Sequence, residues 1–200
     1  YFQLNYIPGK NSIFKSIHRL EPGHFICIKN NKTYVQQWYT IPYHTQAAEQ
    51  NPLTYEQQQN KLVELMDDAV RLRLIADVPL GAFLSGGIDS SVITAMAARH
   101  TPHLNTFSIG FEGNSFFDET PYANLVAKHF NTNHTVFKLK NDDLLQSLEE
   151  LLEYTDEPFA DSSALLVNIL SKFTRRHVTV ALSGDGGDEL FLGYGAYDWA

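Results

Sequence analysis

Apolar residues along positions 54–200 follow two alternating patterns. Short continuous apolar runs at 80–84 and 178–182 are typical of strands buried in a parallel sheet, and runs around 107–109 and 135–137 share this character. Between these runs, residues compatible with helices occupy 62–72, 92–98, 123–130, 144–152 and 164–173. Alternating strands and helices predict an α/β fold, with a parallel sheet and helices on both of its faces.

Residues 1–39 follow a different pattern, which predicts β structure. An apolar run at 25–28 is followed by the turn residues Asn30 and Asn31, and the chain returns through 33–39, as in a hairpin. Residues 40–53 are polar and show neither pattern, so we expect a linker there. Thr54 and Gln57 fit a capping box ahead of a long helix. The predicted organisation is a β segment (1–39), a linker (40–53) and an α/β domain (54–200).

The turn after the first buried strand reads Ser-Gly-Gly-Ile-Asp-Ser-Ser at 85–91. Its two glycines allow a sharp turn with outward N–H groups, and the following helix adds partial positive charge, so the turn suits a phosphate. Asp89 would repel that anion unless a Mg²⁺ ion lies between them. The chain contains no G-x-x-x-x-G-K-S/T, and no G-x-G-x-x-G follows a strand, which disfavours Walker-type NTPases and dinucleotide-binding units. A serine-capped connection is the plainer alternative, but it explains only one serine and one glycine.

A second glycine-rich turn, Ser-Gly-Asp-Gly-Gly-Asp-Glu at 183–189, follows the last buried strand. Taken alone, it is equally well explained as an ordinary solvated connection, because Gly and Asp are common loop residues. However, the carboxyl ends of parallel strands meet at one edge of the sheet, so both turns can face a common ligand. One Mg²⁺ held by Asp89 and Asp188 could then bridge the ligand's phosphates.

Composition and charge exclude several classes of function and partner. The 200 residues carry a net charge of −8 with scattered acidic residues, so neither nucleic acid nor a membrane surface is an expected partner. The single cysteine, Cys27, excludes an internal disulfide and fits a reducing compartment, and its apolar neighbours predict a core position. No apolar stretch has membrane-span length and no signal peptide opens the chain, which favours the cytoplasm. The histidines show no metal-ligand spacing, and His18, His24 and His134 are expected in surface or turn positions.

Three segments together resemble glutamine-dependent asparagine synthetases. They read VPLGAFLSGGIDSS at 78–91, TFSIG at 106–110 and LSGDGGDELF at 182–191. The resemblance extends from about Thr54 to the end and implies the ATP-pyrophosphatase fold, which is like that of the adenine-nucleotide alpha-hydrolases. Residues 1–39 resemble, more weakly, the last strands of the family's N-terminal-nucleophile glutaminase domain. The chain therefore looks like a fragment that contains the end of one domain and most of the next.

The resemblance also implies roles for individual residues. Adenosine contacts, mainly through backbone, would come from Leu84 and Ile109. The pyrophosphate would be held by Ser85, Gly86, Gly87, Asp89 and Ser90, and the ATP site would also be lined by Ser183 and Gly184. Asp188 would share Mg²⁺ with Asp89, and Asp185 would be the catalytic acid that supports an acyl-adenylate. Residues 156–163 are either a helix-capping loop or neighbours of the aspartate pocket.

The implied activity is ATP-dependent asparagine synthesis. The aspartate side-chain carboxylate would be adenylated to β-aspartyl-AMP with release of pyrophosphate, and ammonia from glutamine would then displace AMP. The implied partners are aspartate, ATP, and glutamine or free ammonia, and a homodimer is an open possibility.

This sequence departs from the family pattern in three places. Asp185 stands where glutamate is frequent, Leu192-Gly193-Tyr194 replaces Gly-Gly-Tyr, and Tyr1 stands in place of a nucleophilic cysteine. These departures leave two alternatives open. One is another adenylating amidotransferase or cyclase, which could be β-lactam synthetase-like or peptide-modifying. The other is a catalytically inactive nucleotide-binding module.

Overall fold

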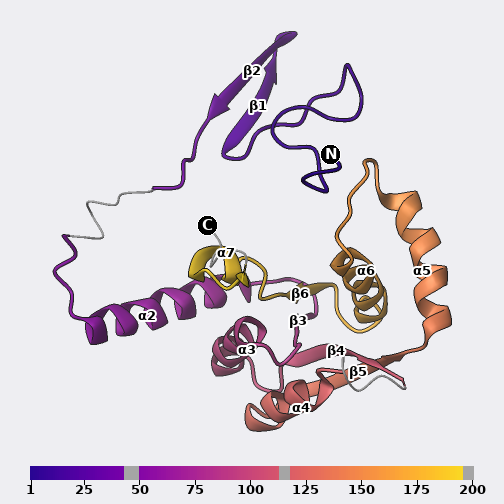
Figure 1. Ribbon diagram of the computed structural model, residues 1–200. Coiled ribbons are helices and arrows are strands. Elements are labelled where there is room, and N and C mark those ends of the chain that lie inside the picture. The colour runs from indigo at the N-terminus through magenta and orange to yellow at the C-terminus, as the bar shows by residue number, and fades with distance from the viewer. Residues whose placement is uncertain (43–49, 113–117, 196–200) are drawn as a thin grey trace. The chain divides into compact units, whose positions relative to one another are not determined.

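The computed structural model describes residues 1–42, 50–112 and 118–195, and the chain forms two compact units (Figure 1). The first unit comprises Tyr1–Thr54 and Leu152–Ser162, and the second comprises Tyr55–Leu151 and Ser163–Ala200. Half of the predicted linker, 43–49, lies outside the described residues. The acidic segment 156–162 falls in the first unit.

The first unit contains the predicted hairpin. Strands β1 (His24–Lys29) and β2 (Lys32–Gln37) pair antiparallel around Asn30 and Asn31, whose φ angles of 51° and 57° are those of a type I′ turn. Every residue of both strands except the half-buried His24 is exposed. The predicted core position of Cys27 is therefore wrong, because it lies exposed in a two-stranded ribbon, which has too little area to bury an apolar run.

The second unit is built on the predicted parallel sheet. Its strands are β3 (Leu80–Phe83), β4 (Asn105–Phe111), β5 (Asn133–Leu139) and β6 (Val180–Leu182), in the order β5-β4-β3-β6. All three pairings are parallel. The chain runs outward from β3 through β4 to β5 and then crosses to the other side of β3. The strand order therefore reverses between β3 and β6, and ligands of open α/β sheets bind at the carboxyl ends of such a pair.

Helices cover both faces of this sheet, as predicted. They are α2 (Tyr55–Arg73), α3 (Ile88–His100), α4 (Thr120–His129), α5 (Asn141–Tyr154), α6 (Ser163–Thr174) and the short α7 (Gly187–Phe191). Ala82 packs with Val70 of α2 and Met96 of α3, and Leu84 packs with Ala123 of α4. Because side chains alternate along a strand, these contacts define one face.

The opposite face is aromatic. Phe107 of β4 stacks on Phe137 of β5 at 6.1 Å between ring centres, and Phe137 stacks on Phe173 of α6 at 5.1 Å. Helix α6 therefore covers the side of the sheet away from α3 and α4 (Figure 1). The predicted surface or turn position of His134 is wrong. It lies half-buried in β5, because the register pairs it with the buried Thr106 of β4.

Candidate nucleotide-binding site

The first glycine-rich turn leaves β3 and enters α3 under tight steric constraint. Gly86 has a φ of 89°, in the left-handed region that favours glycine. A Cβ placed on Gly86 would lie 2.5 Å from the backbone nitrogen of Ala123 and 2.5 Å from the Cβ of Tyr122. The turn therefore needs glycine at this position for its backbone angle and also for its close contact with the start of α4.

The serines of this turn bond to the turn itself. The N–H of Ser85 donates to Ser90 Oγ at 3.2 Å, the two hydroxyl oxygens lie 2.9 Å apart, and the N–H of Gly87 donates to Ser85 Oγ at 3.1 Å. Ser90 Oγ also donates to the carbonyl of Gly87 at 3.3 Å. These bonds hold the turn in one shape before any ligand binds. They also use the N–H groups of Ser85 and Gly87 within the turn, whereas the sequence pattern predicts a turn whose N–H groups point outward to a phosphate.

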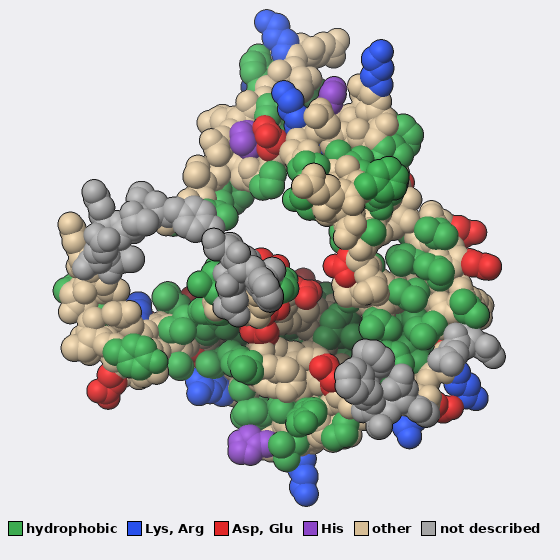
Figure 2. Space-filling view, in the orientation of Figure 1, with side chains coloured by type: hydrophobic (Ala, Val, Ile, Leu, Met, Phe, Trp, Pro, Cys, Tyr) green, Lys and Arg blue, Asp and Glu red, His purple; other side chains and the backbone are tan. Residues whose placement is uncertain are grey.

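The second turn leaves β6 and enters α7. Gly186 has a φ of 94°, and the N–H of Gly187 donates to the carbonyl of Gly184 at 3.2 Å. Asp185 is exposed, and its Oδ2 accepts a hydrogen bond from Ser183 Oγ at 2.8 Å. At the far end of α7, Tyr194 donates to Glu189 at 2.7 Å, which lowers the pKa of that carboxyl. Figure 2 shows acidic side chains over α7 beside exposed apolar ones.

The two turns touch one another. A Cβ placed on Gly184 would lie 2.7 Å from the backbone nitrogen of Ser90 and 3.0 Å from the carbonyl carbon of Asp89. A Cβ on Gly187 would lie 2.6 Å from the Cγ of Asp89. Segments almost a hundred positions apart in the sequence therefore meet at the point where the strand order reverses. The absence of side chains at Gly184 and Gly187 makes this approach possible.

The approach brings the Asp89 carboxylate beside the N-terminus of α7, where it lies against Gly187. The next residue, Asp188, is half-buried and carries a second carboxylate, which lies against Gly193. Among the residues that the structure describes, no group of three or more His, Cys, Asp or Glu side chains is arranged to hold a metal ion. Two carboxylates suit Mg²⁺, which commonly takes one or two of them and fills its remaining positions with phosphate oxygens and water. The donor set therefore fits a Mg²⁺ that arrives with a phosphate ligand.

The two residues expected near adenosine lie on the adjacent strands, Leu84 just after β3 and Ile109 in β4. Leu84 is only 1% exposed, its side chain packs with Ala123 and Ala127, and its N–H donates to the carbonyl of Phe107 at 2.8 Å. Its carbonyl accepts a hydrogen bond from the buried Ser108 hydroxyl. Ile109 is half-buried in β4. The sequence reasoning missed Ser108, although a buried polar residue in an otherwise apolar strand was a usable signal.

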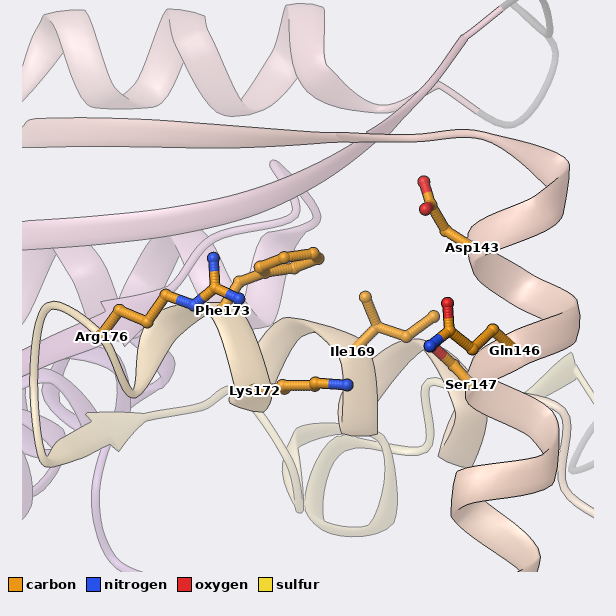
Figure 3. A pocket seen from close by; sticks show the side chains of 7 residues that line it. All are labelled: Asp143, Gln146, Ser147, Ile169, Lys172, Phe173 and Arg176. Carbon is orange, nitrogen blue, oxygen red and sulfur yellow. The ribbon is translucent and has the colours of Figure 1, made fainter.

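A cavity elsewhere in the second unit contains none of the predicted site residues. It has a volume of about 180 Å³ and lies between α5 and α6 (Figure 3). Asp143 and Gln146 line it from α5, and Arg176 lines it from the turn after α6, with its guanidinium 5.0 Å from the centre of the Phe173 ring. The turns, rather than this cavity, carry the candidate chemistry. No helix among the described residues has both the length and the apolar character needed to cross a membrane.

Comparison with known proteins places this site in a family. The family model described as asparagine synthase matches residues 61–200. A Methanocaldococcus jannaschii protein provisionally named asparagine synthetase (glutamine-hydrolyzing) 2 is 39% identical over 97% of this chain and 37% of its own length. Asparagine synthetase (glutamine-hydrolyzing) 1 of Bacillus subtilis is 33% identical over 98% of this chain and 30% of its own length.

This chain thus spans about a third of the length of these curated relatives. A solved structure, the NH3-dependent NAD synthetase from Campylobacter jejuni, aligns with a TM-score of 0.47 at 16% identity, over 68% of this chain and 60% of the other. The family match covers more than half of the chain and includes both glycine-rich turns. This chain belongs to the asparagine synthase family.

Proposed function

We propose that the chain carries the ATP-binding and adenylating part of a glutamine-dependent asparagine synthetase. In the proposed reaction, a side-chain oxygen of aspartate attacks the α-phosphate of ATP and the bond to the β-phosphate breaks. The products are β-aspartyl-AMP and pyrophosphate. Ammonia then attacks the activated carbonyl, the carbon–oxygen bond to AMP breaks, and asparagine is released with AMP. The contact between the two glycine-rich turns at the reversal of strand order supports this proposal.

The first turn would hold the pyrophosphate. At the N-terminus of α3, helical N–H groups and the helix dipole attract an anion. The residues that lie there are Ser85, Gly86, Gly87, Asp89 and Ser90. The hydrogen bonds between Ser85 and Ser90 fix the turn in advance, so little ordering is left for ATP to impose. Ser183 and Gly184 would line the same site from the second turn, and Leu84 and Ile109 would contact the adenosine.

Asp89 and Asp188 would hold Mg²⁺ from the two facing turns. When bound, the ion would neutralise the charge that develops on the phosphate oxygens during transfer. The protein's own contribution would be to supply the two carboxylates from separate turns, which Gly184 and Gly187 allow to meet. This arrangement also keeps Asp89 from repelling the phosphates when the metal is present.

Asp185 would act on the substrate side of the second turn. Its side chain is exposed and is oriented by the hydroxyl of Ser183. A carboxylate oriented in this way can support the acyl-adenylate without taking part in metal binding. Residues 1–39 would be the end of a glutaminase domain that supplies ammonia from glutamine, and 54–200 would be part of the synthetase domain. We also propose that the enzyme is cytoplasmic.

The test is exchange of labelled pyrophosphate into ATP by the complete protein. Exchange is expected only when aspartate and Mg²⁺ are both present, and Asp89→Asn should abolish it. Asp77→Asn, an exposed acid in the loop before β3, is the matched control and should exchange normally. If another carboxylic acid drives exchange and aspartate does not, the asparagine assignment is refuted while adenylation stands. If no acid drives exchange, the adenylating function itself is refuted.

A further inference from the structure

Four polar side chains form a continuous hydrogen-bonded chain on the sheet face that α4 covers. Thr132 Oγ1 lies 2.8 Å from Thr106 Oγ1, which lies 2.9 Å from His134 Nδ1. His134 Nε2 lies 3.3 Å from Ser108 Oγ, and Ser108 Oγ donates to the carbonyl of Leu84. Thr106 is fully buried and Ser108 is 3% exposed. The chain begins at the loop before β5 and ends at the residue that precedes the first glycine-rich turn.

The last bond, together with a neutral ring at His134, sets the direction of every proton in this hydrogen-bonded chain. Ser108 has one hydroxyl hydrogen and gives it to Leu84, so its oxygen must accept a hydrogen from His134 Nε2. In a neutral imidazole the other nitrogen then carries no hydrogen, and Nδ1 accepts from Thr106. Thr106 in turn accepts from Thr132. This order of hydrogen bonds holds when the ring is neutral, and burial favours the neutral form because it lowers the pKa of His134.

This chain of hydrogen bonds fixes the backbone at the start of the first turn. The N–H of Leu84 is bonded to Phe107, and its carbonyl is bonded to Ser108, so both peptide groups of the residue before Ser85 are held by β4. His134 completes the arrangement because its Nε2–H donates to Ser108 Oγ. The hydroxyl hydrogen of Ser108 is then left to bond to the carbonyl of Leu84. Removing either side chain would leave a buried polar group without its partner and free the strand end.

We infer that Ser108 and His134 are positioning residues for the ATP-binding turn. The inference rests on the proposed function, since it is the ATP site that they would position. Neither side chain is hydrogen-bonded to Ser85 or Ser90. They act through the Leu84 carbonyl, from which the turn begins.

Affinity for ATP, measured by titration calorimetry on the complete protein with Mg²⁺, tests the inference. Ser108→Ala and His134→Phe should each raise the ATP KM and Kd about tenfold, with kcat at saturating ATP unchanged. His134→Gln should stay within about twofold of the wild type, because a carboxamide places a donor group and an acceptor atom at its end, as the neutral ring does with its two nitrogens. His129→Gln, an exposed histidine at the end of α4, is the matched control and should behave as the wild type.

Four outcomes would overturn the inference. Wild-type ATP affinity in Ser108→Ala or His134→Phe would show that the turn does not depend on this chain. Equal losses in His134→Gln and His134→Phe would show that restoring a donor and an acceptor does not restore ATP affinity, so the hydrogen bonds of His134 are not what the turn depends on. Independently of any variant, nitrogen NMR of the wild type at pH 7.5 should show His134 neutral and protonated on Nε2, and protonation on Nδ1 would refute the proton order. If the wild type binds no ATP, the proposed function fails first, and this inference fails with it.

Discussion

Gly184→Ala is expected to separate the two glycine-rich turns. A Cβ at this position would lie 2.7 Å from the backbone nitrogen of Ser90, whereas ordinary contact begins at 3.4 Å. The obstructing atoms belong to the backbone of Asp89 and Ser90, so no side-chain rotation relieves the contact. The turns must therefore move apart by about 0.7 Å. Overpacking of this kind costs about 1–3 kcal/mol of folding stability.

The same shift should weaken ATP use more than it weakens the fold. The strands and helices remain, but the groups that hold the phosphates and those that hold Mg²⁺ no longer meet at their native separation. A misplacement of about 1 Å at a reacting centre costs about a hundredfold in rate, so we expect a loss of about ten- to a hundredfold in pyrophosphate exchange. Each kcal/mol of lost stability should lower the melting temperature by about 2–4 °C.

Gly195→Ala is the matched control for this substitution. It makes the same chemical change eleven positions later, and a Cβ there would have no atom of the described residues within 4 Å. Exchange rate, Mg²⁺-ATP affinity and melting temperature should all stay at wild-type values in the control. If Gly184→Ala also binds Mg²⁺-ATP and exchanges pyrophosphate like the wild type, the two turns do not form one site and the geometric argument is refuted.

Two further predictions follow from the charges. Asp188→Asn should weaken Mg²⁺-ATP binding, whereas Asp185→Asn should leave binding nearly unchanged and lower turnover about a hundredfold; equal losses of affinity in calorimetry would place Asp185 in the metal site. Because burial lowers the pKa of His134 below its usual 6.5, the unfolded chain takes up a proton at higher pH than the folded chain does. The neutral His134 therefore contributes fully to folding stability above pH 6.5, and this contribution is lost as the pH falls. The melting temperature should drop less between pH 7.5 and 5.5 in His134→Gln than in the wild type.

The strands and helices could be predicted from the local pattern because apolar residues have a characteristic spacing in each kind of element. Buried strands of a parallel sheet are continuous apolar runs, and the run at 80–84 needs no distant partner to be recognised. The same reasoning failed for Cys27, whose apolar neighbours look like those of a core strand. Burial requires a second layer, and local sequence cannot show whether one covers the strand.

The glycine-rich turns show most clearly which properties follow from the sequence alone and which depend on the tertiary structure. The sequence alone determined their chemistry, because serines, glycines and acids after a buried strand suit a phosphate and a metal wherever they lie. Only the tertiary structure decided that Gly184 lies against Ser90 and that Ser108 and His134 hold Leu84. Those contacts join residues on different strands, and they depend on strand order and register. Order and register are set by the packing of the whole sheet, so no single segment encodes them.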